Sequence, residues 1–161
     1  MNNKIKLNNM ALKADQIDSL CWAKYTTILK EHFGDIGKMA AVDKPQEIQE
    51  KYTEDLPVKI VDEFRSYLET VWKENAPAGA PEFESIMNAK MILEMAKIKY
   101  EEDLYAARAA AEKITTWEKI TSSNDKDVVQ YVGLLKDYSE ELMNALLEDF
   151  MYDVDKYIDG R

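Results

Sequence analysis

The sequence is poor in the residues that build disulfides, metal centres and tight turns. It has one cysteine (Cys21), one histidine (His32), 5 glycines and 4 prolines in 161 residues. A single cysteine excludes an internal disulfide and any metal site made of several cysteines. So few glycines and prolines leave too few turns for an all-β fold. These scarcities predict an all-α protein, and the length favours one helical domain over residues 1–161.

Long apolar runs are missing as well. No window of about 18 residues is both apolar and free of charge, so we expect no transmembrane segment and no membrane partner. The opening residues, MNNKIKLNN, are interrupted by lysines and asparagines and lack the apolar stretch of a signal peptide. We therefore expect the protein in the cytoplasm or inside a virion.

Positive charge is scarce except at the start of the chain. The formal charge is -10, yet residues 1–44 hold 7 basic and 5 acidic side chains, against 14 and 26 in the remainder. A phosphate backbone would be repelled by most of this surface, which argues against a nucleic-acid partner. The slightly basic start suits an acidic protein neighbour, such as another copy of the chain.

The first half of the chain divides into an arm and shorter helices. Residues 1–9 alternate apolar and polar side chains at Ile5 and Leu7, which predicts an extended arm. Helices are expected over residues 9–33, capped by Asn9 or Asp15 and ended by Gly34, then over 43–52 and from Asp55 to about 75. Residues 76–81 hold two prolines and a glycine and form the connection that follows.

The second half predicts two long helices. Residues 82–121 contain no glycine or proline, and their apolar residues repeat every seven positions, as in a helix-packing seam. A cluster of turn-forming residues at 122–125 precedes a last helix over 126–159. Two long helices joined by a tight turn should pair antiparallel. The expected fold is therefore a bundle of about five helices with a long C-terminal hairpin over residues 82–159.

The sequence contains no complete catalytic or metal-binding pattern. A di-iron bundle needs several histidines, and the chain has only His32, which we expect near a helix C-terminus where its charge favours the dipole. Cys21 has no neighbouring base and reads as a small core residue. The acidic residues between Asp149 and Asp159 do not have the spacing of a calcium loop and predict a solvated helix face. We expect no catalytic residue, no metal and no cofactor.

The most unusual segment is residues 86–100, which is apolar nearly all round the expected helix. Such a helix must be surrounded, either by its own bundle or by a partner. Methionine-rich faces adapt readily to partners, so contact with a partner is kept as the second alternative. Together with the arm, it supplies the residues of a candidate interface: Ile5, Leu7, Met87, Met91, Met95 and Ile98.

These patterns favour a non-enzymatic structural subunit of a larger assembly, made with copies of itself or with other proteins. A bacteriophage or viral virion component is the preferred setting, such as a head–tail adaptor, a connector or a capsid-associated protein, by analogy of shape. The alternative is a helical accessory subunit or binding module for an apolar ligand or a partner helix.

Overall fold

The computed structural model describes residues 12–34, 50–86, 94, 98, 101, 105–106, 108–112 and 126–159. These residues form helices and their connections and include no β-strand, which confirms the all-α bundle. The elements are α1 (Ala14–Phe33), α3 (Leu56–Asn75), α4 (Phe83–Ile86), α6 (Lys126–Val154) and the π-helical turn η3 (Asp155–Asp159). The predicted arm over residues 1–9 lies outside the described residues, as does most of the predicted helix over 43–52.

Helix α1 begins at Ala14, between the two starts that the sequence predicts as alternatives. Its N-cap is Lys13, not Asn9 or Asp15, and the Lys13 N–H donates to Gln16 Oε1 at 2.8 Å. Asp15 instead lies in the first turn, where its negative charge favours the helix dipole. The end is as predicted, because Gly34 follows Phe33 with φ 52°, a backbone conformation that favours glycine.

Helix α3 follows its sequence signals closely. Asp55 is the N-cap and Pro57 lies in the first turn, where a missing N–H costs nothing. All six residues of the predicted apolar face are buried: Ile60, Val61, Phe64, Leu68, Val71 and Trp72. The helix ends at Asn75, and residues 76–81 form the non-helical connection predicted there.

Helix α6 and η3 together cover the predicted last helix, residues 126–159. The predicted apolar face is buried along α6 from Val128 to Val154. The prediction missed the change from α- to π-helix at Asp155, and it underestimated the width of the buried face. That face also includes Tyr131, Tyr138, Ser139, Met143, Leu147 and Asp153.

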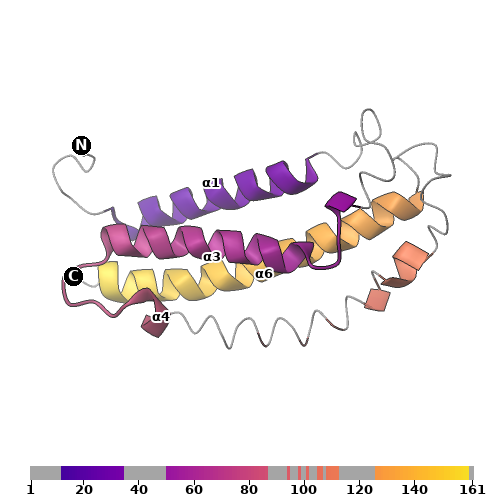
Figure 1. Cartoon of the computed structure of the whole chain (residues 1–161). Helices are drawn as coiled ribbons and strands as arrows, with labels where there is room; N and C mark the ends of the chain where they lie inside the picture. The colour runs from indigo at the N-terminus through magenta and orange to yellow at the C-terminus, as the bar shows by residue number, and fades with distance from the viewer. Residues whose placement is uncertain are drawn as a thin grey trace.

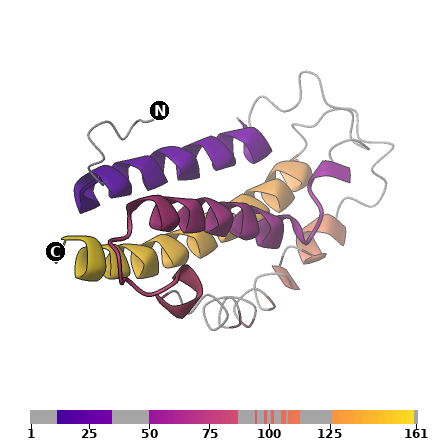
Figure 2. The same cartoon turned by 60° about the vertical axis from the view of Figure 1, so that its left-hand side comes forward.

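The three long helices α1, α3 and α6 pack side by side (Figures 1 and 2). Helices α3 and α6 run in the same direction, because the Tyr131 hydroxyl donates to the Tyr52 carbonyl at their starts and the Trp72 ring meets Phe150 near their ends. Helix α1 runs the opposite way, since Leu12 N–H donates to Asn75 Oδ1 at 3.0 Å.

The parallel pair requires the chain to return along the bundle between α3 and α6. Phe83 contacts Phe150 near the end of α6, with ring centroids 6.2 Å apart. Arg108 pairs with Glu54, beside the start of α3. The residues between Phe83 and Arg108 therefore join the two ends of the bundle. Most of them lie outside the described residues, so the antiparallel hairpin itself stays a prediction.

Candidate functional site

One residue of the predicted interface is described, and it is exposed. Ile5, Leu7, Met87, Met91 and Met95 lie outside the described residues. Ile98 is helical, and 69% of its surface is accessible to solvent. Ile98 therefore lies at the surface of the described chain and not in its core. A residue that contacts a partner must lie at the surface.

Ile98 lies on a line of exposed side chains that we call the outer ridge. Its described members are each helical and are spaced by four and three residues in turn, which is the spacing of one helix face. Tyr105, seven residues after Ile98, is 77% exposed and is the second large apolar group on this line. The outer ridge consists of Glu94, Ile98, Glu101, Tyr105, Arg108 and Glu112, all exposed.

Two residues relate the end of the outer ridge to the bundle. Arg108 Nε donates to both carboxylate oxygens of Glu54, at 3.2 and 3.3 Å, so this cation is compensated within the chain. Ala110, on the other side of the same helical segment, is only 3% exposed and belongs to the core cluster. At this end, the ridge therefore lies along the edge of the bundle beside the start of α3.

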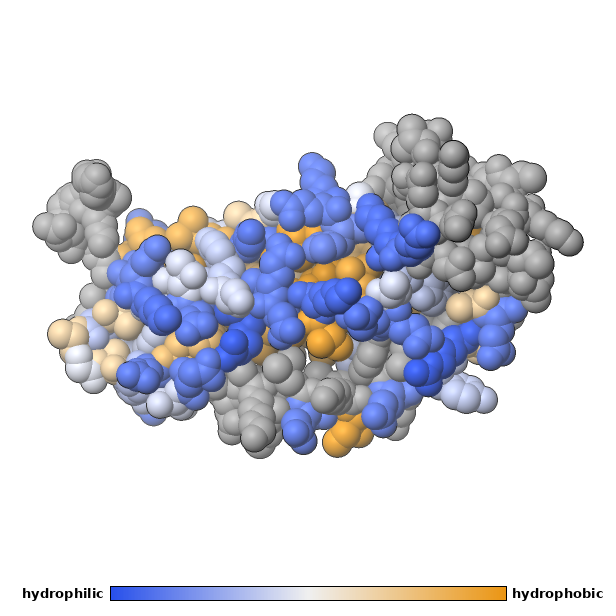
Figure 3. Space-filling view, in the orientation of Figure 1, coloured by the Kyte–Doolittle hydropathy of each residue, from blue (hydrophilic) through white to orange (hydrophobic). Residues whose placement is uncertain are grey.

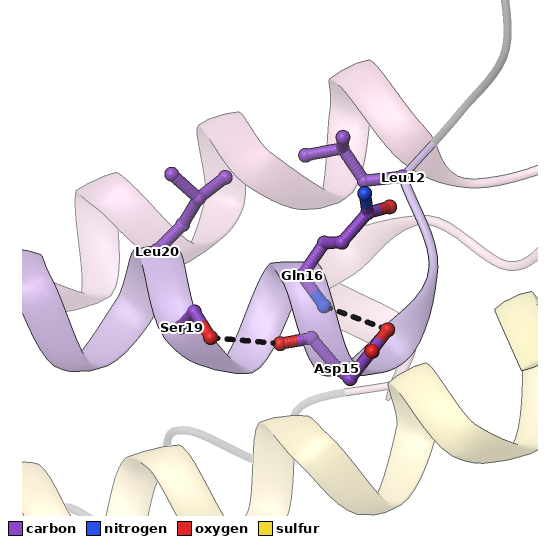
Figure 4. A pocket seen from close by; sticks show the side chains of 5 residues that line it. All are labelled: Leu12, Asp15, Gln16, Ser19 and Leu20. Atoms are coloured by element: carbon purple, nitrogen blue, oxygen red, sulfur yellow. Dashed lines mark hydrogen bonds between the residues drawn. The ribbon is translucent and has the colours of Figure 1, made fainter.

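A shallow hollow of about 450 Å³ lies at the start of α1 (Figure 4). It is lined by Leu12, Asp15, Gln16, Ser19 and Leu20. Two of its polar groups are already engaged within the helix, since Gln16 N–H donates to Asp15 Oδ1 and Ser19 Oγ donates to the Asp15 carbonyl. Leu20, predicted on the buried face of this helix, is instead 41% exposed here.

Cys21 and His32 carry the most reactive side chains in the sequence, and both have structural roles. Cys21 is fully buried, as predicted, and burial together with the nearby Asp18 charge raises the pKa of its thiol to about 12. His32 lies in the last turn of α1, and its Nε2 is 3.1 Å from Glu63 Oε1 on α3. The histidine therefore links two helices, beyond the dipole role expected for it.

The acidic end of the chain is only partly the solvated face that the sequence predicts. Glu148 and Asp155 are exposed, but Asp149 and Asp153 are not. Asp153 is only 8% exposed, and Asp149, one turn earlier, has a buried Oδ2 without a hydrogen-bond partner. Burial raises the pKa of both carboxyl groups, and the Asp149 charge raises that of Asp153 further. The prediction was wrong for these two residues because the buried face at the end of α6 is wider than the stripe of apolar residues along that helix.

This buried pair makes stability depend on pH. Because the folded-state pKa values lie above the ordinary 3.8, the contribution of the pair is most favourable below that value and is lost as pH rises through the folded-state values. We expect the free energy of unfolding of the double variant Asp149→Asn/Asp153→Asn to be about 1 kcal/mol higher than that of the wild-type chain at pH 7. Urea titrations from pH 4 to 8 should show this difference growing with pH. The exposed Asp155→Asn is the control, and an equal gain there would contradict the assignment.

Among the residues that the structure describes, no group of three or more histidine, cysteine or acidic side chains is placed to hold a metal ion. No helix in this part of the chain combines the length and apolar character needed to cross a membrane. Comparison with known proteins adds no relative: no family model, curated protein or solved structure matches this chain.

Tyr105 is absent from the predicted interface, although the sequence contains a signal for it. Met91, Ile98 and Tyr105 recur at sevens, five positions after successive members of the predicted seam. Such positions point away from a helix-packing seam and are normally polar. Apolar residues repeated at outward positions indicate a second contact face.

Proposed function

We propose that this chain is a non-enzymatic helical subunit that binds another protein through the outer ridge. The observation that carries the proposal is the pair Ile98 and Tyr105, 69% and 77% exposed at heptad spacing. A single exposed apolar residue is ordinary in any protein. Two such side chains at a spacing of seven residues, close to two helical turns, can anchor one partner helix.

Other apolar side chains are exposed on the described surface as well. The face in Figure 3 is mainly hydrophilic, with apolar areas between charged side chains. The other large exposed apolar side chains are Leu20, Trp22 and Tyr152, on α1 and α6. Trp22 is in ring contact with Tyr25 of its own helix, with centroids 4.9 Å apart. Ile98 and Tyr105 therefore form the pair best placed for a partner.

The wider setting that we propose is a larger assembly, with a bacteriophage or viral virion as the preferred case. Its support is the basic start of the chain beside a strongly acidic remainder, a charge distribution that favours oriented association. In this setting residues 1–9, with Lys4, Ile5, Lys6 and Leu7, provide a second contact. Removing residues 1–9 should then weaken assembly while helical content by circular dichroism stays unchanged.

A photo-cross-linking experiment tests the proposed function in the cells that make the protein. A benzophenone amino acid is placed at Ile98, at Tyr105 or, as the matched control, at Tyr152, which is 68% exposed on α6. We expect one and the same protein to be cross-linked from positions 98 and 105 and not from 152. Excess wild-type chain should compete, and the chain carrying Ile98→Ser/Tyr105→Ser should not. Equal products from all three positions, or none from 98 and 105, would overturn the proposal.

A further inference from the structure

We infer that the solvent-facing side of α1 is a self-association surface, on which a second copy of this chain lies antiparallel with its Lys30 beside Asp15 of the first. This surface is separate from the outer ridge, so the inference goes beyond the proposed function. Every residue of α1 (Ala14–Phe33) is described by the structure.

The solvent-facing side of α1 has no charge over three helical turns. In Figures 1 and 2 this helix lies along one side of the pair α3 and α6. Most exposed residues of α3 and α6 are charged, whereas interface cores are depleted of charge. Asp18 and Lys24 are only partly exposed, and Lys24 Nζ lies 5.6 Å from the ring centroid of Tyr67 on α3. The exposed residues of this length, which we call the α1 face, are Gln16, Ser19, Leu20, Trp22, Ala23, Thr26 and Thr27.

The hydroxyl groups of the α1 face are already hydrogen-bonded within the helix. Those of Ser19, Thr26 and Thr27 each donate to the backbone carbonyl one turn earlier, at 3.1, 2.9 and 2.9 Å. A buried hydroxyl without an acceptor costs free energy. Covering the α1 face would leave none of these three donors unpaired. These side chains and Ala23 are also small, so the backbone of a second helix can approach closely.

Two large apolar side chains border this low strip. Leu20 is 41% exposed and Trp22 is 44% exposed, and residues two positions apart on a helix point to opposite edges of one face. The Trp22 ring is held by its contact with Tyr25, with centroids 4.9 Å apart, so a partner need not order it. A strip of small residues between two apolar edges fits the width of one helix.

The charges at the two ends of the α1 face indicate a second copy as the partner. Asp15 lies in the first turn and Lys30 in the last, both exposed, and none of the ion pairs found among the described residues involves either. In an antiparallel pair that crosses between positions 22 and 23, Asp15 of each copy lies opposite Lys30 of the other. Ser19 then lies opposite Thr26, and the helix dipoles oppose each other favourably. The α1 face is therefore complementary to itself.

The hollow at the start of α1 provides space for the incoming lysine. It measures about 450 Å³, and its lining includes the apolar side chains of Leu12 and Leu20 and the carboxylate of Asp15 (Figure 4). A lysine places its aliphatic stem against apolar groups and its ammonium near a carboxylate. Asp15 is already oriented, because its Oδ1 accepts from Gln16 N–H at 3.0 Å. In the two-fold pair, each copy offers one such hollow and fills the other with Lys30.

The net charge of -10 on each chain opposes association at low salt, but most of it lies elsewhere in the sequence. Residues 1–44, which include α1, hold 7 basic and 5 acidic side chains. At about 150 mM salt, charges more than about 8 Å apart are largely screened. One face of a 20-residue helix is smaller than a standard protein interface, so we expect a dissociation constant in the micromolar range.

Sedimentation velocity of the full chain at about 150 mM salt tests whether the pair forms. Between about 1 and about 500 µM, we expect the monomer to convert to a dimer and to nothing larger, because a two-fold contact closes on itself. A chain that stays monomeric over this range would overturn the inference, even if the α1 face binds a different protein.

A charge exchange tests the antiparallel arrangement. Asp15→Lys and Lys30→Asp should each weaken self-association at least tenfold, because each places like charges opposite one another twice. A mixture of the two variant chains should restore the dimer, since both pairs are then of opposite charge. Asp62→Lys and Lys73→Asp, at exposed positions on α3, are the controls and should each self-associate like the wild type. A mixture that associates no better than its components would show that the antiparallel pairing is wrong.

A charge in the middle of the α1 face locates the contact. Ala23→Glu should weaken the dimer at least tenfold, whereas Ala145→Glu, at an exposed alanine on α6, should not. Circular dichroism should confirm that both variants fold. A dimer that withstands Ala23→Glu but is lost in Ile98→Ser would place self-association on the outer ridge and contradict the inference. Cross-linking from positions 98 and 105 should be the same in Ala23→Glu as in the wild type, which separates this inference from the proposed function.

Discussion

Replacing Phe150 by alanine should destabilise the protein by about 3–5 kcal/mol, the range for truncating a buried phenylalanine. Phe150 is fully buried on α6 and is the meeting point of three elements. Its ring lies 6.3 Å from that of Trp72 on α3 and 6.2 Å from that of Phe83 on α4, measured between centroids. The truncation would remove both ring contacts. It would also leave a cavity between α3, α4 and α6 that these helices cannot fill by moving closer to one another.

Urea unfolding followed by circular dichroism measures this effect. The matched control is Tyr152→Ala, two residues further along the same helix, where the side chain is 68% exposed and its removal should change stability by less than about 0.5 kcal/mol. Similar losses in the two variants would mean that Phe150 does not connect α3, α4 and α6. A large decrease in the denaturant slope would instead indicate that folding is no longer two-state.

The thiol of Cys21 should react with a disulfide reagent at least about a thousandfold more slowly in the native protein than in urea. Raising the pKa from 9.0 to about 12 lowers the thiolate fraction by three powers of ten near neutral pH. Only the thiolate attacks the reagent, and the sulfur is fully buried between the helices as well. Reaction should therefore follow opening of the bundle.

The absorbance of the released thiol reports this reaction directly. A matched control is the double variant Cys21→Ala/Trp22→Cys, which moves the thiol by one residue to a position where the native side chain is 44% exposed. The moved thiol should react rapidly without denaturant. Fast reaction of native Cys21 would contradict both its burial and its raised pKa, and would return it to the set of candidate reactive groups.

The helices could be predicted from the sequence because their signals are local. Pro57 and Gly34 set a start and an end through backbone geometry that depends only on the residue itself. The apolar spacing of α3 predicted six of its buried residues, and Leu56, Pro57 and Asn75 are buried in addition. Ile98 was included in a candidate interface from its apolar surroundings, and the structure places it at the surface.

The misses have a common physical cause, which is that burial depends on what other elements cover. Leu20 fits the apolar spacing of α1, yet no packing element covers it fully, and it remains 41% exposed. Asp153 is charged and would be expected at the surface, yet the elements packed around the end of α6 leave it only 8% exposed. Tyr105 was missed because no exposure was predicted for the helix positions that point away from the predicted seam.

The sequence by itself determined the helical class, the C-terminal end of α1, both ends of α3 and the uneven distribution of charge. Tertiary structure decided that α3 and α6 run parallel, that Asp149 and Asp153 are enclosed, and that Ile98 and Tyr105 are both exposed. The reason is the range of the interactions. Caps, turns and helical periodicity act within a few residues, whereas direction and burial depend on contacts such as that between Tyr52 and Tyr131, which lie 79 positions apart.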